Sequence, residues 1–306
     1  MNNYDYLPPS LFIMDYLVIA IVLGCTYCLI ALGYALIYSC LKLINFAHGE
    51  FCAVGAYITL WVVLAWNGSW FVAIPAGIVA GGLIAVVTWF VAYRPLRQAE
   101  RSSTILAALG ASICLQQMLA RSFGAQSIGF PESSSNVQMQ FGGINLNATE
   151  IFIVICTAVL LALIHFFWKH TRFGLYVRAV ADDREAAECV GIHADRVIMG
   201  VFLSAGMAAG IAGIALAASF GRVEPTMGFE PALKAFVAAL AGGLHDPRRA
   251  ALGGILLGAV ETITIAIGLS AYRDAIVFML LVSVLTVRAI IEAHSTTLRN
   301  QPLEME

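Results

Sequence analysis

Short groups of polar residues interrupt apolar sequence, and some of their side chains could bind or move a polar solute. The first group is the hexapeptide Asn45-Phe46-Ala47-His48-Gly49-Glu50, in which Asn45, His48 and Glu50 are the candidates for lining a substrate path. A polar turn between apolar helices is expected where a discontinuous membrane helix lines such a path. An ordinary cytoplasmic loop would suit the same residues, and Lys42 just before them favours that alternative.

Two further polar features lie near the C-terminal end. Residues 242–249 form a glycine-rich break that carries His245 and Asp246, and Glu261 lies alone inside the apolar run that follows. An acidic residue at membrane depth is a functional candidate by default, so we add Glu261 to the path-lining set, behind the hexapeptide. A carboxyl group that is hydrogen-bonded for packing is the alternative. The two polar breaks share an arrangement, but their sequences are too different to establish an internal duplication.

The most highly charged part of the chain, residues 169–196, contains the sequence Glu185-Ala186-Ala187 followed by Gly191. A solvated cytoplasmic helix is the simplest interpretation. However, a polar connection of this length is long for a link between two membrane helices. We therefore expect a short amphipathic helix that docks into a partner protein through its apolar side.

The sequence offers no constellation of an enzyme. None of its three lysines, Lys42, Lys169 and Lys234, ends a phosphate-binding loop of the Gly-Lys-Ser/Thr type. No metalloprotease or nucleophile-elbow motif and no His/Cys ligand cluster is present. Cys25-x-x-Cys28 has metal-site spacing but lies in a charge-free helix, where thiolate formation is disfavoured. We expect no catalytic residues, no metal and no cofactor bound by this chain.

The elements that position these residues are predicted by composition. Of 306 residues, 60% are hydrophobic and only 12% are charged, whereas soluble domains carry about 25% charged residues. The formal net charge of −2, without a basic cluster, excludes a nucleic-acid-binding protein. Long apolar runs with few or no charged residues predict an all-α, polytopic transmembrane bundle with about eight spans, near 15–38, 45–66, 70–92, 103–120, 150–168, 197–219, 250–268 and 274–291.

Basic residues set the expected topology. They predict an external N-terminal tail (1–14), a transmembrane domain (15–291) whose charged loop (169–196) is cytoplasmic, and a C-terminal tail (292–306). The apolar piece 232–244 contains Lys234 and is short for a span. If it crosses the membrane, the C-terminus is cytoplasmic; if it is re-entrant, the last two helices reverse.

Small residues four positions apart predict close helix packing. Gly206 and Gly210 form one such pair and Gly254 and Gly258 another, like the pair Gly77 and Gly81. In lipid, close backbone approach supplies much of the association energy between helices.

The hexapeptide, followed by Gly55-Ala56-Tyr57, resembles the signature of the permease subunit of branched-chain amino acid ABC importers, of the LivH type. Glu185-Ala186-Ala187 with Gly191 is similar to the cytoplasmic loop that forms the ATPase-contacting helix of such permeases, without the usual Leu-Pro ending. The stretches Lys234-Ala235-Phe236, Ala241-Gly242-Gly243 and 253–261 resemble the C-terminal half of the family.

This resemblance implies a transmembrane permease subunit of an ABC importer in the bacterial inner membrane. It implies three kinds of partner: a second homologous permease subunit, two ATPase subunits that use the ATP, and a periplasmic substrate-binding protein. Branched-chain amino acids are the implied substrates, with other amino acids, urea and small amides as alternatives. The competing function is a stand-alone secondary transporter or channel, in which His48, Glu50 and Glu261 would relay protons.

Overall fold

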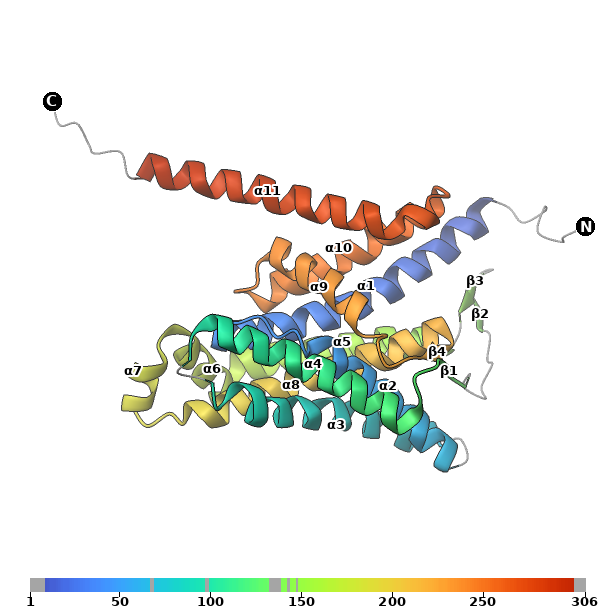
Figure 1. The fold of residues 1–306 in the computed structure, drawn as a ribbon. Helices are drawn as coiled ribbons and strands as arrows, with labels where there is room; N and C mark the ends of the chain where they lie inside the picture. The colour runs from blue at the N-terminus through green and yellow to red at the C-terminus, as the bar shows by residue number, and fades with distance from the viewer. Residues whose placement is uncertain are drawn as a thin grey trace, which may run out of the picture.

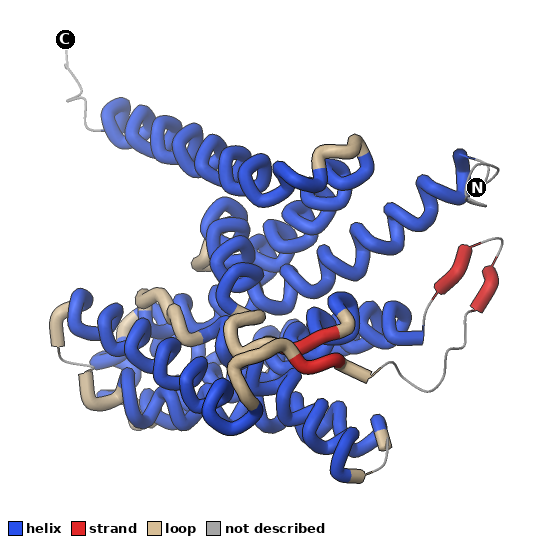
Figure 2. Tube along the Cα trace, turned by 45° about the vertical axis from the view of Figure 1, so that its right-hand side comes forward, coloured by secondary structure: helices blue, strands red, loops and turns tan. Residues whose placement is uncertain are grey.

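The chain folds into a bundle of long helices with two small strand pairs at one end, as seen in a computed structural model that describes residues 9–66, 69–96, 99–131, 139–141, 144–146 and 148–299 (Figures 1 and 2). The long helices are α1 (Pro9–Leu41), α2 (His48–Ala65), α3 (Trp70–Thr88, continued by the π-helical turn η1, Trp89–Tyr93), α4 (Arg101–Phe123), α5 (Ala148–His170), α8 (Ala194–Phe220), α10 (Pro247–Ala266) and α11 (Arg273–Arg299). The shorter helices are α6 (Arg172–Asp182), α7 (Arg184–Cys189), α9 (Phe229–Gly242) and the 3₁₀ turn η2 (Ser270–Tyr272). The strands are β1 (Ile128–Gly129), β2 (Met139–Phe141), β3 (Ile144–Leu146) and β4 (Arg222–Val223).

The all-α, polytopic prediction is confirmed. Within the described part of the chain, seven helices are long and apolar enough to cross a membrane. The predicted eighth span, 274–291, coincides with α11, several of whose side chains lie outside the described residues. Two expected tails are partly helical, because α1 already begins at Pro9 and α11 continues to Arg299. The rest of both tails, 1–8 and 300–306, lies outside the described residues.

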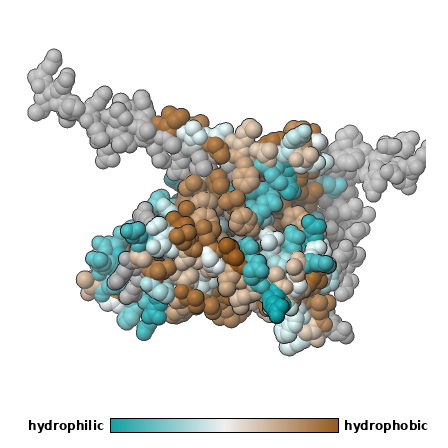
Figure 3. Space-filling model, viewed as in Figure 1, coloured by the Kyte–Doolittle hydropathy of each residue, from teal (hydrophilic) through white to brown (hydrophobic). Residues whose placement is uncertain are grey.

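Apolar side chains cover the middle of the molecule and hydrophilic ones gather toward its two ends (Figure 3). Exposed large apolar residues are found on nearly every long helix, for example Phe71 (95% exposed) on α3 and Leu106 (68%) on α4. In water such a surface would be unfavourable, whereas lipid tails solvate it.

Helix α8 lies at the centre and packs against α1, α2 and α3. Glycines permit this packing: a Cβ on Gly210 would come 3.2 Å from the Ile78 Cα of α3, and one on Gly55 of α2 would come 2.6 Å from the Gly210 Cα. Gly206 lies against Gly81 and Gly82 in the same way. The α3 and α8 glycine pairs thus face each other.

Helices α1 and α10 form a second close pair. A Cβ on Gly254 would come 2.6 Å from the backbone of Tyr27 and Cys28, and Gly258 lies against Gly24. The six glycines named for packing therefore belong to two separate interfaces, four of them to α3–α8 and two to α1–α10.

The short helix α9 belongs to a segment that connects the two ends of the molecule. Val223 pairs with Ile128 at the end that carries the strands, while the His245 ring lies 5.3 Å from that of Tyr38, near the other end of α1. Helix α9 itself spans 14 residues, about 21 Å, less than a bilayer core of about 30 Å. The turns between β4 and α9 cover the remaining distance. Helices α10 and α11 therefore run in the directions expected when the segment around 232–244 passes from one end of the molecule to the other (Figure 1).

Candidate functional site

The polar hexapeptide forms a buried turn between α1 and α2. Helix α1 ends at Leu41, and Lys42 adopts a left-handed φ of 53°. The Asn45 side-chain oxygen then accepts hydrogen bonds from the Ala47 amide (3.1 Å) and the Tyr93 hydroxyl (2.8 Å), the latter from η1. Asn45 is 1% exposed. The turn is thus tied into the bundle and differs from an ordinary solvated loop.

His48, the first residue of α2, is enclosed by aromatic rings. Its imidazole centroid lies 4.6 Å from that of Tyr34 on α1 and 5.7 Å from that of Phe51. The absence of a side chain on Gly33 leaves room for the ring, since a Cβ there would overlap it. The ring lies near the backbone of Ile30. The ring is therefore close to one backbone acceptor, but neither ring nitrogen makes a hydrogen bond of good geometry with a described residue.

Glu50 is fully buried and joins α2 to α4. Its Oε1 accepts hydrogen bonds from Ser112 Oγ (3.0 Å) and from Gln116 Nε2 (2.8 Å), while Oε2 has no partner in the described part of the chain. Glu50 also lies in the first turn of α2, where the helix dipole favours a negative charge. Ser112 and Gln116 were not predicted, because neither stands out in the sequence of an apolar helix.

Several buried polar atoms of the hexapeptide have no hydrogen-bond partner within the described structure. Buried polar atoms are rarely left without partners, because each costs about 1–3 kcal/mol. In the described structure Asn45 Nδ2, both His48 nitrogens and Glu50 Oε2 are in that position. Water or a polar solute that reached these atoms would relieve the cost.

Glu261 does not join the hexapeptide cluster. Its Oε1 lies 2.9 Å from Arg273 Nε and 3.5 Å from Lys234 Nζ, and Lys234 also pairs with Glu230 (2.8 Å) and Asp274 (2.5 Å). These five residues, called here the ion cluster, connect α9, α10 and the start of α11. Glu261 was expected behind the path residues; the structure gives it ion-pair partners of its own instead.

Lys234 is the buried charged residue that sequence reasoning underrated. Its side chain is 1% exposed, as is that of Glu261. A lone lysine in the otherwise uncharged piece 232–244 was the available signal, because a buried charge requires a partner. Of its partners, Glu230 lies one helical turn earlier, whereas Glu261 and Asp274 could not be identified because they lie 27 and 40 residues away in sequence.

The predicted docking segment contains two helices and not one. Helix α6 buries Gly174, Val177 and Val180, and Asp183 then caps α7 by accepting a hydrogen bond from the Ala186 amide (3.0 Å). Gly191, two residues after the end of α7, has a positive φ of 86°.

Helix α7 is fixed to the bundle by charged residues. Arg184 contacts Asp195 of α8 (2.8 Å), and Asp195 contacts Arg94 at the end of η1 (3.2 Å). The side of α7 that was expected to dock includes Ala186, Ala187 and Val190. Ala187 is buried within the chain, whereas Ala186 is exposed and Val190 is 76% exposed. Glu185 and Gly191 are exposed as well. The exposed tip of the segment is therefore Glu185, Ala186, Val190 and Gly191.

The second polar break is an ordinary helix boundary. Gly243 takes a positive φ of 113° after α9, and Asp246 caps α10 by accepting a hydrogen bond from the Arg248 amide (3.0 Å). Among the described residues, no three His, Cys, Asp or Glu side chains gather as they would around a metal ion.

Comparison with known proteins identifies the family. Residues 16–285 match the model of the branched-chain amino acid transport system permease component. The chain belongs to this family. It is 34% identical over 281 residues to the high-affinity branched-chain amino acid transport system permease protein LivH of Escherichia coli K12, covering 87% of this chain and 91% of the relative.

Two further relatives match the chain to different extents. The permease protein BraD of Pseudomonas aeruginosa, also of a high-affinity branched-chain amino acid system, is 31% identical over 90% of this chain and 94% of its own length. The fructose import permease protein FrcC of Rhizobium meliloti is 30% identical over 47% of this chain and 41% of its own length. The protein is thus a multi-pass membrane permease.

Proposed function

We propose that this permease is the membrane subunit of an ABC importer, which carries branched-chain or related amino acids across the bacterial inner membrane by ATP-driven alternating access. Its partners would be a second homologous permease, two ATPase subunits and a periplasmic binding protein. Family membership supports the permease role, and the observation that carries the proposal is the exposed tip of α7. No phosphate-binding loop occurs in the sequence, so another chain must hydrolyse the ATP.

The geometry of α7 suits a mechanical connection. Its exposed tip can enter a groove on an ATPase, while Arg184, Asp195 and Arg94 join it to the first turn of α8 and to the end of η1. Helix α8 packs against α1, α2 and α3. A push on α7 would therefore reach the central helix of the bundle directly.

The hexapeptide is the proposed part of the substrate path. Helix α9 packs on the start of α2, where a Cβ on Gly49 would come 2.6 Å from the Gly228 carbonyl oxygen. Two helix N-termini, with their partly positive dipole ends, and the unsatisfied atoms of Asn45, His48 and Glu50 thus lie close together. Such groups can hold a zwitterionic or neutral solute without fixed ion pairs.

Replacing Val190 by aspartate tests the coupling role. Val190 is 76% exposed and its substitution removes little packing within the chain, so V190D should insert and assemble normally at the membrane. Burying a carboxylate in an ATPase groove is costly; we expect substrate-stimulated ATPase activity and uptake to fall at least tenfold. The matched control is Arg222→Gln, an exposed change on β4 at the opposite end.

Normal substrate-stimulated ATPase activity in V190D, in complexes that contain both ATPase subunits, would contradict the docking role of α7. Glu185→Lys offers a second test at the same tip. Gly191 is less suitable, because its positive φ disfavours any side chain even though open space surrounds it.

A further inference from the structure

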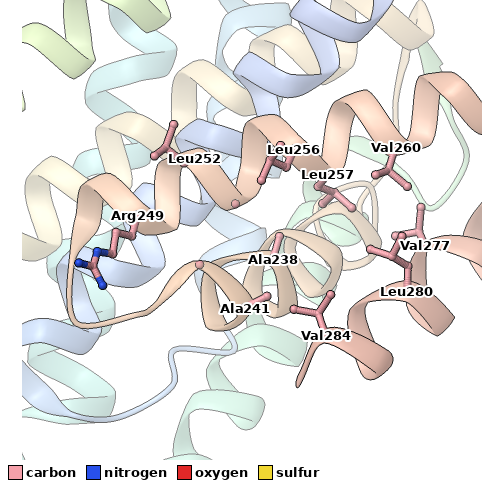
Figure 4. A pocket seen from close by; sticks show the side chains of 12 residues that line it. Ala238, Ala241, Arg249, Leu252, Leu256, Leu257, Val260, Val277, Leu280 and Val284 are labelled. Atoms are coloured by element: carbon pink, nitrogen blue, oxygen red, sulfur yellow. The ribbon is translucent and has the colours of Figure 1, made fainter. Parts of the chain in front are cut away.

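An apolar groove runs between α9, α10 and the first half of α11 (Figure 4). Its volume is about 310 Å³. Leu252, Leu256 and Val260 of α10 line one side, and Val277, Leu280 and Val284 of α11 line the other. All six side chains are hydrocarbon.

The groove is polar at one mouth only. Arg249, in the first turn of α10, lines that mouth and its side chain is 74% exposed. Its Nε forms an exposed ion pair with Asp246 Oδ2 at 3.7 Å, a distance too long for a hydrogen bond. Arg248 beside it is exposed too. Near the opposite end, the charges of the ion cluster, such as Lys234 and Asp274, are paired with one another.

The length and width of the groove fit a single hydrocarbon chain. From Arg249 to Val260, α10 rises about 17 Å, close to half of a bilayer core of about 30 Å. A volume of about 310 Å³ over that length gives a mean cross-section of about 18 Å². A helix about 10 Å across needs about 80 Å², so a helix of a second permease chain does not fit inside.

We propose that this groove binds one acyl chain of an anionic phospholipid, whose phosphate contacts Arg249. Three observations agree on this occupant: an apolar channel, one leaflet in length, and a cationic group at the mouth. The mouth lies at the end of the molecule that carries α7, because His245, four residues before Arg249, contacts Tyr38 near the end of α1. The lipid would therefore come from the leaflet on the α7 side.

The proposal is tested by lipid retention. The assembled complex is placed in nanodiscs that contain equal amounts of phosphatidylglycerol and phosphatidylcholine, extracted with mild detergent, and the phospholipid that remains bound is measured by mass spectrometry. Arg249→Gln should reduce retained phosphatidylglycerol about fivefold, the factor expected for one arginine at a membrane surface, and leave phosphatidylcholine unchanged. Leu256→Trp should fill the groove and reduce both lipids.

Two control variants distinguish loss of lipid from the groove from effects on folding or on general lipid contact. Arg222→Gln removes an arginine at the opposite end, and Leu64→Trp enlarges a residue that is 66% exposed on α2, away from the groove. Both should retain wild-type lipid. Equal retention of phosphatidylglycerol in wild type, R249Q and L256W would overturn the proposal. Disulfide formation between a Leu256→Cys variant and a cysteine of the second permease chain would also overturn the proposal, because protein would then cover the groove.

Discussion

At the scale of single residues, burial separates the polar side chains into two groups with different surroundings. Asn45, His48 and Glu50 have unused hydrogen-bonding atoms within the described structure. Lys234 and Glu261 are engaged in ion pairs, although Glu261 Oε2 also lacks a hydrogen-bond partner there. Unused capacity suits transient contact with a solute, and paired charges suit a fixed joint. Sequence alone placed Glu261 with the path residues, because hydropathy shows that a charge is buried but not which partner it has.

A cysteine at position 48 tests the path assignment. His48 is fully buried in this conformation, so His48→Cys, in a background where exposed Cys114 and Cys189 are serine, should react slowly with a water-soluble maleimide. During ATP turnover the rate should change several-fold if the turn opens to the path. Phe202→Cys, at a fully buried core position, is the control. A labelling rate at position 48 that does not change with ATP turnover, like the rate at position 202, would contradict the assignment of His48 to the path.

Removing the lysine of the ion cluster tests its structural role. Lys234→Met leaves the buried Glu261 carboxylate with Arg273 as its remaining cationic contact. Breaking a buried pair costs about 3–5 kcal/mol, so the free energy of unfolding of the purified permease should fall by about 3 kcal/mol. Adding Glu261→Gln should restore at least half of the loss. Additive losses in the double variant would show that the two side chains act independently.

At the scale of elements, the helices were predictable and their interruptions were less so. Apolar runs with few charged residues located the seven described spans, since a lipid-crossing helix requires about 20 mainly apolar residues. The division of 169–196 into α6 and α7 was missed, because the Asp183 cap that separates them is one polar residue among many. Similarly, the role of α4 as a partner of Glu50 depends on Ser112 and Gln116, whose spacing carries no distinctive signal.

Two glycines on different helices make a matched test of packing. A Cβ on Gly206 would come 2.9 Å from the Gly82 Cα and against Ala85, while one on Gly110 of α4 meets nothing within 4 Å. Gly206→Ala should therefore destabilise the permease by about 1–3 kcal/mol through overpacking. Gly110→Ala should be neutral or stabilising by about 0.5–1 kcal/mol, because alanine favours the helix. Thermal unfolding in detergent measures both, and equal effects would contradict the α3–α8 contact.

At the scale of the whole molecule, the two ends carry different structural features. The end with α7, Arg94 and Asp195 presents a charged, exposed tip, and the other end carries the strand pairs and the start of α11. Between them lie the hexapeptide turn and the central helix α8, which packs against α1, α2 and α3. This arrangement connects a surface for a partner to a buried polar turn through one rigid element.

Uptake by the reconstituted importer is the most direct measurement of the central claim, that another chain's ATP drives this permease. Proteoliposomes that contain the permease pair, the two ATPases and the binding protein are supplied with radiolabelled leucine, isoleucine and valine. We expect uptake against a concentration gradient that requires ATP on the side of the membrane that carries the ATPase subunits. The uptake rate should fall at least tenfold when the ATPases are deficient in hydrolysis. Uptake that persists at the same rate without the ATPase subunits would contradict the account and favour a stand-alone transporter.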